Sequence, residues 1–129
     1  MSYSKAKGKG KGHKHVQLWR SMQDSEAWRS LSLSGRCVWL EIMNRFNGHN
    51  NGEIPLSCRE AAELCNISKG TASKAFNELL EKGFIKVGWY SSFTCKYKKS
   101  RRWIITHYPL EKSKAPTNEW RNWSEAEAK

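Results

Sequence analysis

The sequence has few acidic residues. Its 129 residues contain 12 Asp and Glu against 23 Lys and Arg, which gives a formal net charge of +11 at pH 7. The sequence isoelectric point is about 9.7. An excess of positive charge on this scale predicts a polyanionic partner, most often a nucleic acid and less often an acidic membrane surface.

Long apolar runs are also absent. No stretch approaches the roughly 20 residues that a membrane-spanning helix needs. The basic start of the chain, MSYSKAKGKGKGHKHVQLW, has no apolar stretch after its charges, as a secretory signal would have. We therefore expect a cytoplasmic, nucleoid-associated protein with no membrane contact. Hydrophobic residues make up 38% of the chain, enough for one domain but not for a core along the whole length.

Metal-binding and catalytic signatures are missing as well. The four cysteines, at positions 37, 58, 65 and 95, form no Cys-x-x-Cys pair and have no matching His cluster. We expect neither a zinc site nor, in the cytoplasm, a disulfide framework. There is no Ser-His-Asp pattern, P-loop, G-x-G-x-x-G motif or convincing pair of carboxylates. The expectation is a protein that is not an enzyme and needs no cofactor or metal.

The positive charge is unevenly distributed along the chain. Residues 1–15 carry five lysines and no acidic residue. Several of the lysines alternate with glycine, and the segment has few apolar groups. Such a segment buries too little surface to offset its ordering entropy, so we expect a disordered Lys/Gly-rich arm. Residues 16–109 are expected to form the folded domain. Residues 110–129 are expected to form a polar C-terminal tail with a short helix from Asn118.

Two helices are expected in the first part of the domain. Residues 24–31 predict a short helix capped by Asp24 or Ser25. A longer helix is expected to be capped by Ser34 and to end at Gly48, because apolar residues recur at helical spacing between them. Residues 53–56 predict a brief extended piece, since Pro55 disfavours helix at the residue before it.

A tight helix-turn-helix pattern follows. Ser57 and Glu60 form the signature of a capping box at the start of a helix that ends near Cys65. Asn66 tolerates the left-handed backbone that a sharp turn requires. Ser68 caps the next helix, which is expected to run to Lys82 and to place five apolar residues on one face: Ala72, Ala75, Phe76, Leu79 and Leu80.

The remaining elements are strands. FIKVGWY at 84–90 and RRWIITHY at 101–108 are rich in β-branched and aromatic residues. Joined by a Ser- and Lys-rich loop, they predict an antiparallel hairpin. The fold class expected is therefore α+β, with three or so helices and a two- to three-stranded antiparallel sheet.

Helix, turn, helix and basic hairpin together resemble a winged helix-turn-helix. IPLSCREAAELCNISKGTASKAFNELLEKGFIKV is similar to the DNA-binding heads of GntR-type regulators and to winged-helix proteins of phages and plasmids, including replication proteins. The resemblance implies a DNA-binding protein whose second helix is the recognition helix and whose hairpin is the wing. Asn66 departs from the usual turn glycine. No effector-binding domain follows, so regulation by a small molecule is not implied.

The candidate DNA-binding residues lie at the start of the helix capped by Ser57, at the start of the helix at 68–82 and in the wing. Small, polar and cationic side chains at the start of the helix at 68–82 let its backbone approach a groove and offer donors to bases and phosphates. The wing, at about 90–102, adds a run of cations suited to the DNA backbone or minor groove. The residues expected to bind DNA are Ser57, Arg59, Ser68, Lys69, Gly70, Thr71, Ser73, Lys74, Asn77, Lys96, Lys98, Lys99, Arg101 and Arg102.

Interpretations without DNA binding are also compatible with these two segments. The helix at 68–82 can be an ordinary amphipathic helix with a solvated basic face, and the wing cations can serve only for solubility. Three functions fit the pattern: a sequence-specific regulator of transcription on a phage or mobile element, an origin-binding replication or packaging adaptor, and a nonspecific nucleic-acid or RNA-binding protein. The adaptor would recruit a protein partner through Trp120 and Trp123, which can alternatively dock on the domain. A homodimer is expected because winged helices usually read paired half-sites of double-stranded DNA.

Overall fold

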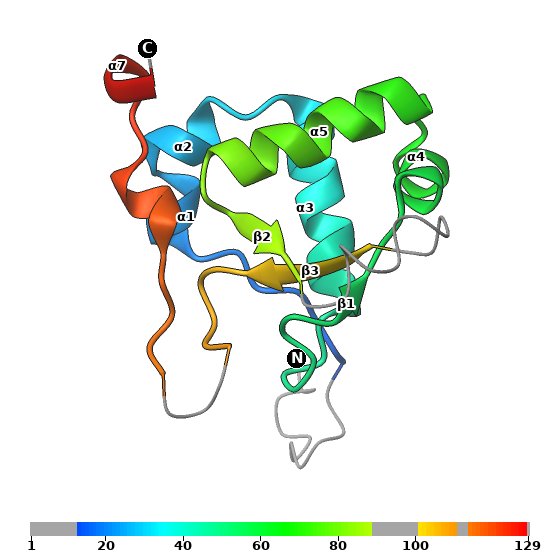
Figure 1. Ribbon diagram of the computed structural model, residues 1–129, viewed down its shortest axis with the longest axis horizontal. Coiled ribbons are helices and arrows are strands. Elements are labelled where there is room, and N and C mark those ends of the chain that lie inside the picture. Colours follow the sequence, from blue (N-terminus) through cyan, green and yellow to red (C-terminus); the bar gives the residue numbers. More distant parts are fainter. Residues whose placement is uncertain (1–12, 89–100, 111–113, 129) are drawn as a thin grey trace, which may run out of the picture.

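The protein has an α+β architecture of helices and a small three-stranded antiparallel sheet (Figure 1). The computed structural model describes residues 13–88, 101–110 and 114–128. Within these ranges the chain forms, in order, α1 (Arg20–Gln23), α2 (Glu26–Arg29), α3 (Leu33–Arg45), β1 (Ile54–Pro55), α4 (Cys58–Cys65), α5 (Lys69–Glu81), β2 (Ile85–Val87), β3 (Arg102–Ile105), the 3-10 helix η3 (Glu119–Asn122) and α7 (Glu125–Ala128).

The sheet has the order β1-β3-β2, with both pairings antiparallel. Ile54 lies opposite Trp103 on one side of β3, and Ile85 lies opposite Ile105 on the other. The pairing of β2 with β3 is that expected of the hairpin, and β1 makes the sheet three-stranded. Residues 89–100, which connect β2 to β3 and were expected to form most of the wing, lie outside the described residues.

The helix-turn-helix pattern is confirmed in detail. Ser57 Oγ accepts from Glu60 N, and Ser57 N donates to Glu60 Oε1, each at 3.1 Å, so the capping box is complete. Asn66 adopts the left-handed conformation, with φ 63° and ψ 44°. Ser68 Oγ accepts from Thr71 N at 3.0 Å and caps α5. Gly83, with φ +85°, ends that helix as expected.

The limits of α3 differ from expectation at both ends. Ser32, not Ser34, caps the helix, because Ser32 Oγ accepts from Gly35 N at 3.0 Å and Ser34 lies inside the first turn. The helix ends at Arg45 rather than near Gly48. The Asn50 side chain explains the early end: its Nδ2 donates to Arg45 O at 3.0 Å, while its Oδ1 accepts from Asn47 N at 2.9 Å.

The two short helices before α3 were less visible in the sequence. Of the two caps considered for α2, Ser25 is the one used, with its Oγ accepting from Trp28 N at 3.1 Å. The four-residue helix α1 was not expected. It has no side-chain cap that could have indicated it in the sequence. The burial of Met22 in the core positions this helix instead.

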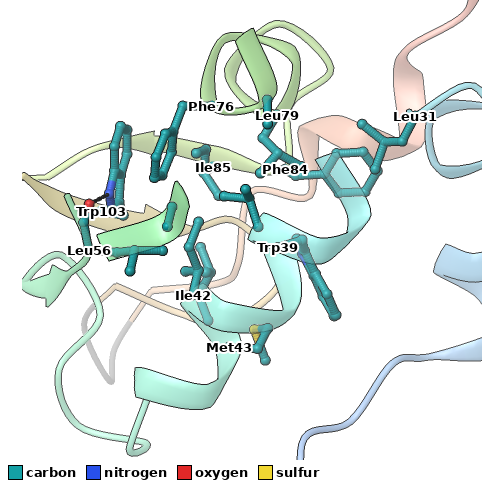
Figure 2. Packing of buried hydrophobic residues seen from close by; sticks show 14 of the residues in the cluster. Leu31, Trp39, Ile42, Met43, Leu56, Phe76, Leu79, Phe84, Ile85 and Trp103 are labelled. Carbon is teal, nitrogen blue, oxygen red and sulfur yellow. Dashed lines mark hydrogen bonds between the residues drawn. The ribbon is translucent and has the colours of Figure 1, made fainter. Parts of the chain in front are cut away.

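The core lies between α3, α5 and the sheet (Figure 2). Trp103 in the central strand stacks on Phe76 of α5, with ring centroids 4.8 Å apart and an interplanar angle of 10°. Trp103 Nε1 donates to Leu56 O at 2.9 Å, so the buried indole leaves no unpaired donor. Trp39 and Ile42 of α3 are fully buried. Trp28, Trp39 and Trp103 are each at most 5% exposed, so all three belong to the core.

The C-terminal segment is packed on the domain. Trp120 is only 2% exposed and lies parallel to Phe84, with ring centroids 6.4 Å apart. Asn118 N donates to Thr106 O at 2.9 Å, and Lys86 forms an ion pair with Glu119 at 2.6 Å. The polar segment after residue 109 is therefore docked on the domain, which is one of the two alternatives that the sequence left open for Trp120. A Cβ on Gly83 would lie within 2.8 Å of Glu119 and Trp120, so the helix stop and the tail share a close contact.

Other expectations concern membranes and metals. No helix in the described ranges is both long and apolar enough to cross a membrane. Over the same residues, no group of three or more His, Cys, Asp or Glu side chains is placed to hold a metal ion. Three half-buried cysteines are unpaired thiols, and burial raises the pKa of Cys65, beside Cys37, to about 12.

Removing the Trp120 side chain is expected to destabilise the protein. A large buried aromatic replaced by alanine loses its transfer free energy and leaves a cavity, so Trp120→Ala should lower the free energy of unfolding by about 3–5 kcal/mol. Denaturant unfolding of the full chain measures this. Trp123→Ala is the matched control, because Trp123 is only half-buried. Equal, small losses for both variants would contradict the packing of η3.

A second prediction concerns His107, which is 2% exposed. Trp19 meets its ring edge-on at 4.9 Å and Trp39 stacks on it at 5.8 Å. Neither imidazole nitrogen has a hydrogen-bond partner within the described part of the chain. Desolvation by burial lowers the pKa of His107 from 6.5 to about 4.

Because this pKa is lower in the folded state, the unfolded chain binds more protons between pH 6.5 and 4. Stability should therefore fall as the pH is lowered through this window, by about 3 kcal/mol in total from this group. Chemical denaturation at several pH values measures the loss. His107→Leu should remove that component, so a wild-type and a variant curve of the same slope would refute the assignment.

Candidate nucleic-acid interface

Helix α5 presents its predicted DNA-binding side chains on one face. The opposite face buries Ala72, Ala75, Phe76 and Leu79. Thr71 is half-buried, at the edge between the two faces. The structure leaves the other predicted residues of this helix and its cap exposed: Ser68, Lys69, Gly70, Ser73, Lys74 and Asn77.

The hydroxyl groups at the start of α5 are partly engaged. Ser68 Oγ accepts from Thr71 N and donates to Thr71 Oγ1 at 3.0 Å. This arrangement uses the Ser68 proton but leaves the Thr71 hydroxyl proton available to an acceptor outside the helix. The unpaired backbone N–H groups of the first turn give this end of the helix a partial positive charge.

The start of α4 is held by a residue that the sequence reasoning did not identify. Arg45 Nη1 donates to Pro55 O at 3.2 Å and to Glu60 Oε2 at 3.3 Å, joining the end of α3 to β1 and α4. Hydrogen bonding from the Ser57 backbone and the nearby Arg45 lower the pKa of Glu60. Ser57 itself is half-buried and occupied by the capping box, so among the α4 candidates Arg59 is the one with an exposed side chain.

The base of the wing lies beside α4. Leu56 N donates to Arg101 O at 3.1 Å, which places exposed Arg101 next to the residue that precedes the Ser57 cap. The Arg101 guanidinium carbon is 5.9 Å from the Trp103 ring centroid. Arg102 is half-buried at the start of β3. Lys96, Lys98 and Lys99 fall in 89–100 and so lie outside the described residues.

Four exposed cations of this surface take no part in the ion pairs that the described residues form. The ion pairs found in the described ranges are Arg29–Asp24, Arg45–Glu60 and Lys86–Glu119. None of them includes Arg59, Lys69, Lys74 or Arg101. Uncompensated cations on one exposed surface can attract a polyanion over a distance set by the ionic strength.

Acidic residues mark the limit of this surface on α5. A groove lies between α5 and the start of α3, lined on the α5 side by Thr71, Lys74, Ala75, Asn77, Glu78 and Glu81. Glu78 accepts from Ser32 N at 3.0 Å and from Ser32 Oγ at 2.7 Å. This carboxylate is a bridge between helices and not a candidate for binding an anion, which confines the basic surface to the first half of α5.

Comparison with known proteins adds no assignment: no protein-family model matches the chain, and no curated protein or solved structure matches it.

Gly70 can be tested directly, because the fold gives no reason for glycine there. A Cβ at this position would meet only Ser68 Oγ, at 3.9 Å. Alanine is favoured over glycine inside a helix, so Gly70→Ala should stabilise the protein by about 0.5–1 kcal/mol. Gly83→Ala is the matched control and should destabilise it, because Gly83 is left-handed and a Cβ would meet backbone at 2.8 Å. Thermal or denaturant unfolding distinguishes the two, and a destabilised Gly70→Ala protein would contradict the described first turn.

Proposed function

We propose that the protein is a winged helix-turn-helix protein that binds double-stranded DNA in a sequence-specific manner. In this proposal α5 is the recognition helix, the segment between β2 and β3 is the wing, and the protein regulates transcription on a phage or other mobile element. The observation that carries the proposal is the first half of α5: small side chains and two lysines lie on an exposed face at a helix N-terminus, and neither lysine is in an ion pair among the described residues.

The geometry supports entry of α5 into a major groove. The groove of B-DNA admits one α-helix, and recognition helices contact base edges through their N-terminal residues. With Gly70 and Ser73 on the exposed face, little side-chain volume separates the backbone of α5 from a groove floor. Lys69 and Lys74 are long enough to reach phosphates or the acceptors of guanine. Asn77, one turn further on, offers both a donor and an acceptor.

Arg59 and Arg101 extend the proposed contact to the sugar-phosphate backbone. They come from the start of α4 and from the base of the wing, which the Leu56–Arg101 hydrogen bond holds side by side. Contacts of this kind fix the position of a protein on the duplex without reading sequence. In the proposal, α4 and the wing set the register and α5 reads the bases.

The adaptor hypothesis loses its expected anchor in this arrangement. Trp120 is buried against Phe84 and is not available to a partner protein, and Trp123 is half-buried with Lys82 Nζ 4.3 Å from its ring centroid. Deletion of residues 110–129 would remove core packing as well as any partner site, so it does not separate the two hypotheses. The nonspecific alternative is separated by sequence preference in the duplex.

The test begins with selection of random-sequence duplexes on the purified protein at a stated physiological salt concentration. The proposal expects an enriched motif. On that motif, Lys69→Ala and Lys74→Ala should each weaken binding by about tenfold and reduce the salt dependence by about one phosphate contact where the lysine contacts phosphate. Fluorescence anisotropy against salt measures both quantities.

Lys114→Ala is the matched control, because Lys114 is also an exposed lysine but lies in the C-terminal segment. Gly70→Ala should weaken binding to the motif even though it stabilises the fold. Absence of an enriched motif, with binding at low salt alone, would show that the charge acts without base reading.

A further inference from the structure

The segment between α3 and β1 contains both Asn-Gly pairs of the sequence, Asn47-Gly48 and Asn51-Gly52. When glycine follows asparagine, the backbone nitrogen of the glycine can attack the side-chain amide with little hindrance, because glycine has no Cβ. The two pairs share this local chemistry but not their surroundings. The fold therefore determines which of them can react.

The Asn51-Gly52 pair is restrained at each reacting atom. Asn51 is 8% exposed, and its Oδ1 accepts from Ile105 N at 2.7 Å. Gly52 N, the nitrogen that would attack, donates to Trp103 O at 3.1 Å. The Asn51 Nδ2 atom lies 3.0–3.2 Å from the carbonyl oxygens of three residues in and after β3: Ile105, Tyr108 and Pro109. Reaction at this pair requires these hydrogen bonds to break first.

The Asn47-Gly48 pair is exposed at both residues. Gly48 is left-handed, with φ +92°, and a Cβ added there would meet nothing within 4 Å. Neither Gly48 N nor Asn47 Nδ2 has a hydrogen bond among the described residues. In this part of the chain, no hydrogen bond restrains the attacking nitrogen or the leaving amide group.

A backbone N–H is also directed at the oxygen that would gain charge in the reaction. His49 N donates to Asn47 Oδ1 at 2.7 Å, which folds the Asn47 side chain over the Gly48 peptide. Attack by Gly48 N on Asn47 Cγ places negative charge on this oxygen. A donor already positioned there stabilises the tetrahedral intermediate, as the donors of an oxyanion hole do.

We propose that Asn47 deamidates spontaneously in the folded protein, whereas Asn51 is protected. Gly48 N gives its proton to hydroxide and bonds to Asn47 Cγ. The Cγ–Nδ2 bond then breaks, and the amide nitrogen takes a proton from water and leaves as ammonia. Water opens the resulting cyclic imide at either carbonyl and yields aspartate or isoaspartate. The net reaction consumes water and releases ammonia, and it needs no oxidant or reductant.

Both products alter the turn that ends α3. Each replaces a neutral amide by a carboxylate and so lowers the formal net charge of +11 by one. Isoaspartate also inserts a methylene into the backbone between residues 47 and 48. The hydrogen bonds from Asn50 Nδ2 to Arg45 O and from Asn47 N to Asn50 Oδ1 both span that link. The isoaspartate form must therefore distort the turn to keep them.

The test is incubation of the full chain in mildly alkaline buffer, with and without denaturant, followed by peptide mass spectrometry. Cleavage after Arg45 and Arg59 gives one tryptic peptide, 46–59, that carries both pairs. Its fragment ions locate each conversion of amide to acid, and a zero-time sample gives the background from digestion. In the folded protein, residue 47 should convert about tenfold or more faster than residue 51, which reacts only from opened states. In denaturant the two rates should converge.

Variants separate the parts of the proposed geometry. Asn47→Gln keeps an amide but lengthens the side chain, so conversion at residue 47 should be lost. His49→Pro removes the N–H donor and should slow conversion of Asn47 several-fold in the folded protein but not in denaturant. His49→Ala is the matched control, because it keeps the backbone N–H, and it should leave the rate unchanged. Circular dichroism verifies that each variant is folded.

Three results would overturn the inference. Asn47 could stay intact in the folded protein, it could convert no faster than Asn51, or the ratio of the two rates could be the same with and without denaturant. A His49→Ala protein slowed as much as His49→Pro would overturn the role given to the backbone N–H. None of these outcomes depends on the proposed DNA-binding function, because the experiment contains no duplex.

Discussion

The packing of Trp103 on Phe76 is the contact on which the remaining structure depends. Trp103 occupies the central strand, and its indole donates to Leu56 O just before α4 begins. Through one side chain the sheet is therefore joined both to α5 and to the segment that leads into α4. Arg101, two residues earlier, lies over the same ring. The angle between α5 and the base of the wing is fixed by this buried contact and not by the exposed residues proposed to bind DNA.

Elements whose signals are local in the chain were predictable from the sequence. The capping box, the left-handed Asn66 and the stop at Gly83 each depend on residues within a few positions, and all three were confirmed. Helix limits set by distant partners were not. Ser32 caps α3 and is itself hydrogen bonded to Glu78. Nothing in the sequence near Ser34 indicates that Ser32 is the preferred cap.

The C-terminal segment is a clearer case in which distant partners, not local residues, determine the structure. Its composition is polar and its few aromatics could equally have been exposed, so a tail was the reasonable expectation. Trp120 is buried because Phe84 offers a parallel ring and Gly83 has no side chain to obstruct it. In the candidate site, the side chains on α5 could be assigned to its exposed face from helical spacing. The bridging role of Arg45, and the absence of the α5 lysines from the ion pairs of the described residues, could be seen only in the tertiary structure.

Helices α3 and α5 are mechanically connected. Glu78 holds the start of α3 against the middle of α5, and Phe76 and Leu79 of α5 are buried in the shared core. Neither helix can rotate without breaking these contacts. The direction of α5, the proposed recognition helix, is therefore set by its buried contacts and by the bridge from Glu78 to Ser32.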